Sequence, residues 1–122
     1  MNLKHVTINV KNMQESLEFY NKLIGLPVKN RFSPAPGSEI VFLGEGGTEI
    51  ELICNESHTD VSFGGDISVG FQVDSVPETI ETLKQNGIVP GDILKPNPNV
   101  RFFFVSDPNG LRVQFIEYIK YA

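Results

Sequence analysis

The chain has a single cysteine, Cys54, among 122 residues, so it cannot form an intrachain disulfide. It also lacks any apolar run of the length that spans a membrane. The opening Met1-Asn2-Leu3-Lys4 leads directly into an alternating pattern and has no signal-peptide features. Together these absences predict a cytoplasmic protein in a reducing compartment, with no membrane partner.

Basic residues are few and scattered. Lys and Arg number 10 against 15 Asp and Glu, which gives a net charge of −5 and argues against nucleic acid as a partner. A hydrophobic content of 40% with 20% charged residues is ordinary for a globular protein. No low-complexity tract is present, and a chain of this size can bury roughly two-thirds of its unfolded surface. We therefore expect one domain over residues 1–122.

The most informative feature that is present is an internal repeat with an offset of 63 residues. His5 corresponds to Ser68 and Glu51 to Gln114, each pair being 63 positions apart. Two copies of one unit can pair about a pseudo-two-fold axis, which brings equivalent residues together. We place the repeat units at about 1–56 and 66–122, and we expect these four polar positions to converge.

The first unit begins with a strand and a helix. Residues 3–10 alternate between polar and apolar, which is the period of a β-strand. Asn12 can cap the helix that follows, Glu15 completes a capping box, and Gly25 provides a natural end. The predicted apolar stripe of this helix consists of Met13, Leu17, Tyr20 and Ile24.

Two further strands complete the first unit. Residues 38–43 and 48–54 are predicted to pair as a hairpin across a glycine-rich turn. Residues 31–37 are predicted to form a loop, although 27–32 could add a weakly paired strand. The polar segment 55–66 has no periodicity and joins the two units.

The second unit repeats this plan. A capping box again precedes the helix, and a Pro-Gly turn separates the last two strands. The predicted elements are strands 67–73, 100–105 and 111–119, a helix between Ser75 and Gly87, and a loop over 90–99. The resulting class is α+β, with two tandem βαβββ-type units forming a curved mixed sheet around a central cleft and helices outside.

Polar and apolar residues occupy opposite faces of the predicted strands. The apolar faces must pack under the helices, so the polar faces should line the cleft. The polar sets are His5, Thr7 and Asn9; Glu49 and Glu51; Ser68, Gly70 and Gln72; Arg112 and Gln114. This segregation predicts a binding site more strongly than any single residue does.

Four segments resemble the vicinal oxygen chelate superfamily, which includes glyoxalase I, methylmalonyl-CoA epimerase, extradiol dioxygenases, and fosfomycin and bleomycin resistance proteins. They are LKHVTINVKNMQESLEFYNKLIGLPV, TEIELI, VDSVPETIETLKQNGI and VSDPNGLRVQFIE. The resemblance covers nearly the whole chain, and these motifs are far less specific for any one activity. It implies a small-molecule substrate or ligand and a homodimer that can exchange halves. It implies no nucleotide cofactor.

In glyoxalase I-like members four positions ligate a divalent metal. By resemblance they fall on His5, Glu51, Ser68 and Gln114, where the third is usually His and the fourth Glu. Serine is a poor ligand for first-row metals and glutamine offers a neutral oxygen, so the metal site is altered. The resemblance implies a metal such as Ni, Zn, Co, Mn or Fe held by His5, Glu51 and Gln114.

Glu51 is the expected catalytic residue of a glyoxalase I-like or epimerase-like lyase. A metal would polarise a substrate carbonyl, and a carboxylate would move the neighbouring proton. Gln114 cannot accept a proton, which leaves Glu51 alone in this role. The expected substrate contacts are Arg112, Thr7, Gln72 and Phe103.

Each of these residues also has a simpler interpretation. His5 could be a hydrogen-bonded wall residue, Glu51 could pair with a cation such as Arg112, and Phe103 could fill the core. Cys54 has the apolar parity of its strand and should pack. A metal-free small-molecule binding protein of the bleomycin resistance type is therefore the alternative function, and a dimeric scaffold is a third.

Overall fold

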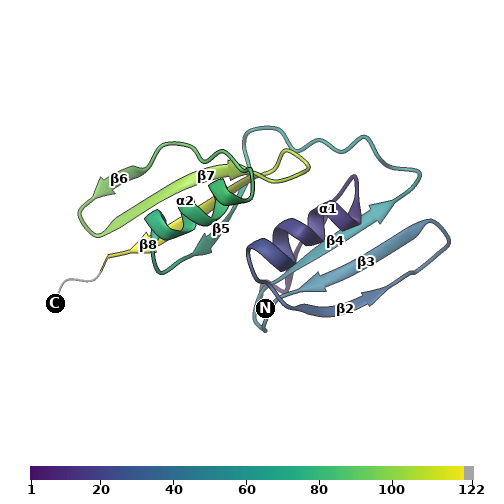
Figure 1. Cartoon of the computed structure of the whole chain (residues 1–122). Helices are drawn as coiled ribbons and strands as arrows, with labels where there is room; N and C mark the ends of the chain where they lie inside the picture. Colours follow the sequence, from purple (N-terminus) through teal and green to yellow (C-terminus); the bar gives the residue numbers. More distant parts are fainter. Residues whose placement is uncertain (120–122) are drawn as a thin grey trace. The chain divides into compact units, whose positions relative to one another are not determined.

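The computed structural model describes residues 1–119 and divides after Ser62 into two compact units (Figure 1). The last three residues of the predicted second repeat lie outside the described residues. The first unit contains β1 (His5–Asn9), α1 (Met13–Leu17), η1 (Glu18–Leu23), β2 (Val28–Phe32), β3 (Ser38–Leu43) and β4 (Glu49–Asn55). The second contains β5 (Ser68–Gln72), α2 (Val76–Gln85), β6 (Leu94–Asn97), β7 (Val100–Ser106) and β8 (Arg112–Tyr118).

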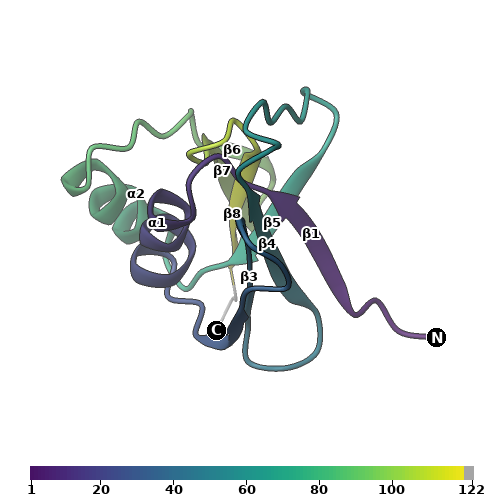
Figure 2. The same ribbon diagram turned by 90° about the vertical axis from the view of Figure 1, so that its right-hand side faces the viewer.

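Each unit is a four-stranded mixed sheet, with strand orders β1-β4-β3-β2 and β5-β8-β7-β6. The first strand of each unit pairs in parallel with the last, and the other pairings are antiparallel. In each unit the helix packs against one face of its own sheet (Figure 2). The predicted α+β class with two βαβββ units is confirmed.

The buried core of each unit lies between its helix and its sheet. In the first unit Ile8, Val41 and Leu52 are at most 1% exposed, as strand alternation predicts. In the second unit Val76 and Val113 are completely buried. Burial of such side chains contributes roughly 1.5–3 kcal/mol each to folding. We call the opposite side of each sheet, which its own helix does not cover, the helix-free face.

Both helices begin at the predicted caps. The backbone N–H of Glu15 donates to Asn12 Oδ1 at 3.0 Å, and that of Glu78 donates to Ser75 Oγ at 3.2 Å. These bonds satisfy amides that a helix leaves free at its start, which fixes where each helix leaves its strand.

The first helix does not keep α-helical spacing. After Leu17 it continues as the π-helix η1, in which Ile24 N–H bonds to Phe19 O at 3.0 Å. The wider turn rotates the later residues, so Phe19 is 4% exposed and Tyr20 fully buried while Ile24 is only partly buried. The predicted stripe is therefore correct through Tyr20, and Phe19 replaces Ile24.

Two edge strands depart from the sequence analysis. The weak pairing considered for 27–32 is present as β2, which is exposed along its length and pairs with β3 through an irregular register. The predicted loop 90–99 is wrong in part, because β6 pairs with β7. Pro96 hid this strand, but an edge strand tolerates proline because one side forms no ladder. No helix among residues 1–119 is long and apolar enough to cross a membrane.

Candidate functional site

The predicted imidazole and carboxylate meet on the helix-free face of the first sheet. Strands β1 and β4 pair in parallel, which places Thr7 opposite Glu51 and His5 opposite Glu49. His5 Nε2 lies 3.5 Å from Glu51 Oε1, and the Glu51 side chain is 13% exposed. The structure thus confirms that these two residues come together, while the metal role stays a prediction.

Thr7 fixes the Glu51 carboxylate. Its hydroxyl donates to Glu51 Oε1 at 2.6 Å, a short charge-assisted hydrogen bond. The imidazole of His5 has its own support, since it packs edge-on against Phe42 with ring centroids 5.6 Å apart. Within the described residues the two polar contacts of the Glu51 side chain both reach Oε1. Oε2 takes part in neither contact.

The separation of His5 and Glu51 fits two ligands of one metal. A distance of 3.5 Å is long for a hydrogen bond. An imidazole nitrogen and a carboxylate oxygen are both atoms that could ligate a first-row divalent metal. Residues 1–119 contain no group of three or more His, Cys, Asp or Glu that could hold a metal. Any further ligand must be of another kind, such as an amide oxygen or water.

A second carboxylate, Glu49, lies on the same face of this strand, as the sequence analysis predicts, but its partner was not predicted. Glu49 is 4% exposed, and its Oε2 lies 2.6 Å from Lys29 Nζ of β2. The Lys29 ammonium lowers the pKa of Glu49, outweighing the opposite effect of burial. Glu49 therefore stays ionised beside His5. The alternation of Glu49 with Glu51 placed it on this face, but no sequence signal identified the edge-strand lysine.

The other predicted ligand positions lie on the helix-free face of the second sheet. Gln114 pairs with Gly70 of β5 and with Phe104 of β7. A Cβ atom on Gly70 would stand 3.0 Å from Gln114 Oε1, so the carboxamide occupies the space that the missing side chain leaves. Ser68 is exposed and pairs with Arg112. The possible metal-ligating groups on this face, Ser68 and Gln114, are therefore neutral. Arg112 is the charged residue beside them.

The predicted substrate contacts are divided between the two faces. Thr7, Gln72 and Arg112 are exposed on helix-free faces. Phe103 is instead fully buried on the helix side, where it stacks on Phe115 with centroids 5.4 Å apart. The pairing of β7 with β8 sends Phe104 to the helix-free face beside Gln114. Phe103 is therefore a core residue, and Phe104 is the partly buried aromatic neighbour of Gln114.

Within its own unit Arg112 contacts an aromatic ring, and the pairing with Glu51 considered above stays a prediction. Its guanidinium lies over the ring of Phe104 at 4.1 Å from the centroid. Arg101 is the arginine that forms a carboxylate pair in this unit, with Glu117 on the helix side. Glu117 also accepts a hydrogen bond from the N–H of Val76, at the start of α2.

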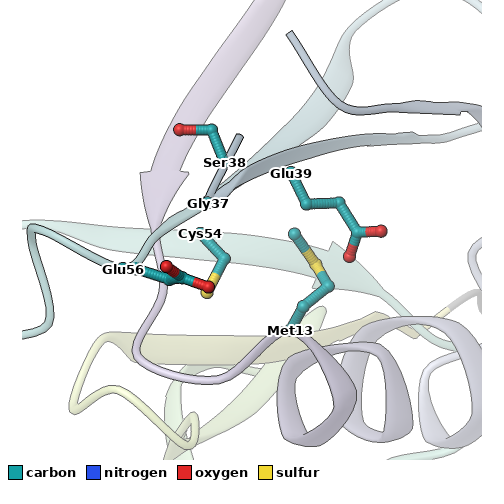
Figure 3. A pocket seen from close by; sticks show the side chains of 6 residues that line it. All are labelled: Met13, Gly37, Ser38, Glu39, Cys54 and Glu56. Carbon is teal, nitrogen blue, oxygen red and sulfur yellow. The ribbon is translucent and has the colours of Figure 1, made fainter. Parts of the chain in front are cut away.

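A separate pocket of about 270 Å³ lies in the first unit, at the ends of β3 and β4 nearest α1 (Figure 3). Its lining comprises Met13, Gly37, Ser38, Glu39, Cys54 and Glu56, and it contains none of the predicted site residues. Cys54 is partly buried, with its thiol 3.8 Å from Lys11 O. This contact agrees with a packing role on the helix side of the sheet.

Known proteins resemble the chain along almost its full length. The lactoylglutathione lyase of Escherichia coli O157:H7 is 29% identical, covering 96% of this chain and 93% of the relative. The lactoylglutathione lyase of Haemophilus influenzae is 28% identical with the same coverage of 96% and 93%.

Solved structures share the fold. The glyoxalase I of Leishmania major superposes with a TM-score of 0.82 at 22% identity, covering 96% of this chain and 86% of that one. A glyoxalase family protein from Enterococcus faecalis gives 0.76 at 24% identity, with coverage of 95% and 97%. The family model of the Glyoxalase/Bleomycin resistance protein/Dioxygenase superfamily matches residues 2–115. The chain belongs to this superfamily.

Proposed function

We propose that the chain is a small-molecule enzyme of glyoxalase I or epimerase type, in which Glu51 moves a proton next to a carbonyl. The observation that carries this proposal is the convergence of His5 Nε2 and Glu51 Oε1 at 3.5 Å on the helix-free face. His5, Glu51 and the amide oxygen of Gln114 are the residues that would hold a divalent metal. A metal bound there would polarise the substrate carbonyl and so lower the cost of removing the neighbouring proton.

The chain's own residues supply the remaining steps. Thr7 holds Glu51 Oε1, which limits the rotation of the carboxylate and leaves Oε2 to act on the substrate. Glu51 then takes the proton from the carbon next to the carbonyl and returns it to the product. Gln114 can hold an oxygen by hydrogen bonding but cannot accept a proton, so one carboxylate serves both transfers.

The lactoylglutathione lyases among the relatives suggest the substrate for a test. S-lactoylglutathione is incubated with the protein in D₂O, with each of Ni²⁺, Zn²⁺, Co²⁺, Mn²⁺ and Fe²⁺, and deuterium at carbon 2 of the lactoyl group is followed by NMR. We expect exchange in the wild type and in the control Glu39→Gln, and loss of exchange in Glu51→Gln. Exchange that persists unchanged in Glu51→Gln would refute the role of this carboxylate.

A metal-free binding protein is the second candidate. The observation that favours it is the helix-free face of the second unit, where Ser68 and Gln114 offer a hydroxyl and an amide in place of charged ligands. Ligand binding that persists in excess EDTA, with no exchange under any metal, would select this function. A homodimer, a cytoplasmic location and a shared central cleft remain predictions under either proposal.

A further inference from the structure

The helix-free faces of the two units carry opposite charge. In the first unit this face bears Glu51 and Glu49, and Lys29 of β2 pairs with Glu49. In the second unit, Arg112 is the only charged residue on this face of the described strands β5, β7 and β8. Arg112 stands at the repeat position of Glu49, 63 residues later. The second repeat thus has a guanidinium where the first has a carboxylate, in a chain whose net charge is −5.

Arg112 differs from the other arginines in its partners. Arg31 and Arg101 each form a two-bonded pair with a carboxylate, Glu39 and Glu117 respectively. Within the described part of its own unit, no carboxylate lies at ion-pair distance from Arg112. Its guanidinium rests instead on Phe104, 4.1 Å from the ring centroid. Stacking restrains the plane of the group while leaving its N–H edge to bind an anion in bidentate fashion.

Two serines stand in register with Arg112 on the neighbouring strands. Arg112 pairs in register with Ser68 on β5 and with Ser106 on β7. All three side chains are exposed, and they share one face because they lie opposite one another across neighbouring strands. A guanidinium with a serine hydroxyl on each neighbouring strand supplies donors for the acceptor oxygens of a carboxylate or phosphate. Ser68, which is poor as a metal ligand, has a clear use in such a site.

The position of Arg112 relates the anion to the reaction. Gln114 is two residues farther along β8 on the same face, which is about 7 Å along a strand. An anionic group at Arg112 would therefore lie a few bonds from an oxygen that Gln114 holds. We propose that Arg112, supported by Phe104 and flanked by Ser68 and Ser106, binds a carboxylate or phosphate of the substrate. The substrate class is then a small carbonyl compound that carries such an anion.

This anion subsite rests on the proposed function through Gln114, the neighbouring residue that the proposal assigns to the same site, but its test requires no turnover. ¹⁵N-labelled protein is titrated with pyruvate, with inorganic phosphate and with the neutral ester methyl pyruvate. The signals followed are the Arg112 Nε–H and the amides of β5 and β8. We expect saturable shifts with at least one anion, and none with methyl pyruvate. The anion that binds more tightly shows whether the subsite prefers a carboxylate or a phosphate.

Matched variants decide the outcome. Arg112→Gln should weaken anion binding at least tenfold, Arg112→Lys should weaken it less, and Ser68→Ala should weaken it severalfold. Lys84→Gln removes an equal charge from an exposed position on α2 of the same unit and should change nothing. Equal affinity in wild type and Arg112→Gln, or no saturable binding of either anion, would overturn the subsite.

The two proposals fail separately. Glu51→Gln should lose deuterium exchange while keeping the anion affinity of the wild type. Binding at Arg112 without exchange in the wild type would leave the subsite standing and remove the enzyme. Exchange that is unaffected by Arg112→Gln at subsaturating substrate would remove the subsite and leave the enzyme.

Discussion

Replacing Glu117 by Gln should destabilise the second unit. Arg101 donates to Glu117 Oε1 from Nε at 2.9 Å and to Oε2 from Nη2 at 3.1 Å. The N–H of Val76 donates to Oε1 at 2.7 Å. One carboxylate thus neutralises an arginine and caps α2, which fixes the helix to β8, the strand that carries Arg112 and Gln114.

The magnitude follows from the number and burial of these bonds. The Glu117 side chain is 11% exposed and that of Arg101 31% exposed, so water replaces the lost contacts poorly. The glutamine amide retains one acceptor oxygen but turns an N–H₂ group toward the guanidinium. Hydrogen bonds to charged groups contribute about 1.5–3 kcal/mol each, and a lost helix cap costs about 1 kcal/mol. We expect Glu117→Gln to lower the free energy of unfolding by about 2–3 kcal/mol.

Glu39→Gln is the matched control. Arg31 and Glu39 form the same two-bonded geometry, at 3.0 and 3.1 Å, but their side chains are 51% and 34% exposed. Exposed ion pairs contribute about 1 kcal/mol or less. Urea unfolding followed by circular dichroism at pH 7 should therefore separate the two variants. Equal losses in both would refute the argument from burial.

The loss of unfolding free energy caused by Glu117→Gln should also depend on pH. Hydrogen bonds from Arg101 and from Val76 lower the pKa of Glu117 below its ordinary value of 4.5. The stabilisation is then fully present above about pH 4.5 and is lost as pH falls through the lower folded-state pKa. The difference between wild type and Glu117→Gln should shrink below pH 4. A difference that stays constant from pH 7 to pH 3 would contradict this account.

Three further outcomes are expected. Thr7→Val should lower kcat/KM about tenfold or more, because a charge-assisted hydrogen bond to Glu51 is lost, whereas Thr7→Ser should stay near wild type. Steady-state kinetics measures both variants, and equal kcat/KM values in the two would remove the orienting role of Thr7. Phe103→Ala should lower the free energy of unfolding by about 3–5 kcal/mol and Phe104→Leu by less than about 1.5 kcal/mol, because Phe103 is fully buried and Phe104 is not. A denaturant titration that ranks the two variants in the opposite order would refute the assignment of these residues to the two faces. Ser68→His combined with Gln114→Glu should raise Zn²⁺ affinity at least tenfold by calorimetry, because the change restores two strong ligands, and an unchanged affinity would show that these positions do not share a metal with His5 and Glu51.

The sequence predicted the strand faces well, because alternation has only two phases. Burial of Ile8 requires exposure of Thr7 and His5 on the other side, and the parallel pairing then brings Thr7 to Glu51. The first residues of the helices were equally predictable, since Asn12 and Ser75 cap them through hydrogen bonds to nearby backbone N–H groups. These features depend on neighbours in the chain, and a single sequence records such neighbours directly.

Features that depend on distant partners were harder to predict. Three consecutive phenylalanines fit either phase of a strand, and only the pairing of β7 with β8 decides that Phe103 is buried and Phe104 is beside Gln114. The π-helix shifts Ile24 away from the core, and no residue pattern marked it. The contact of Lys29 with Glu49 depends on the irregular edge strand β2. In each case the local sequence allows more than one conformation, and contacts with distant residues determine which one forms.

Isothermal titration of the chelator-treated protein with Ni²⁺ and Zn²⁺ tests most directly whether His5 and Glu51 form a metal centre. We expect one saturable site per chain in the wild type and in Glu39→Gln. That site should be lost in His5→Gln and in Glu51→Gln. Metal binding of unchanged affinity in both variants, or no binding of either metal to the wild type, would contradict the account.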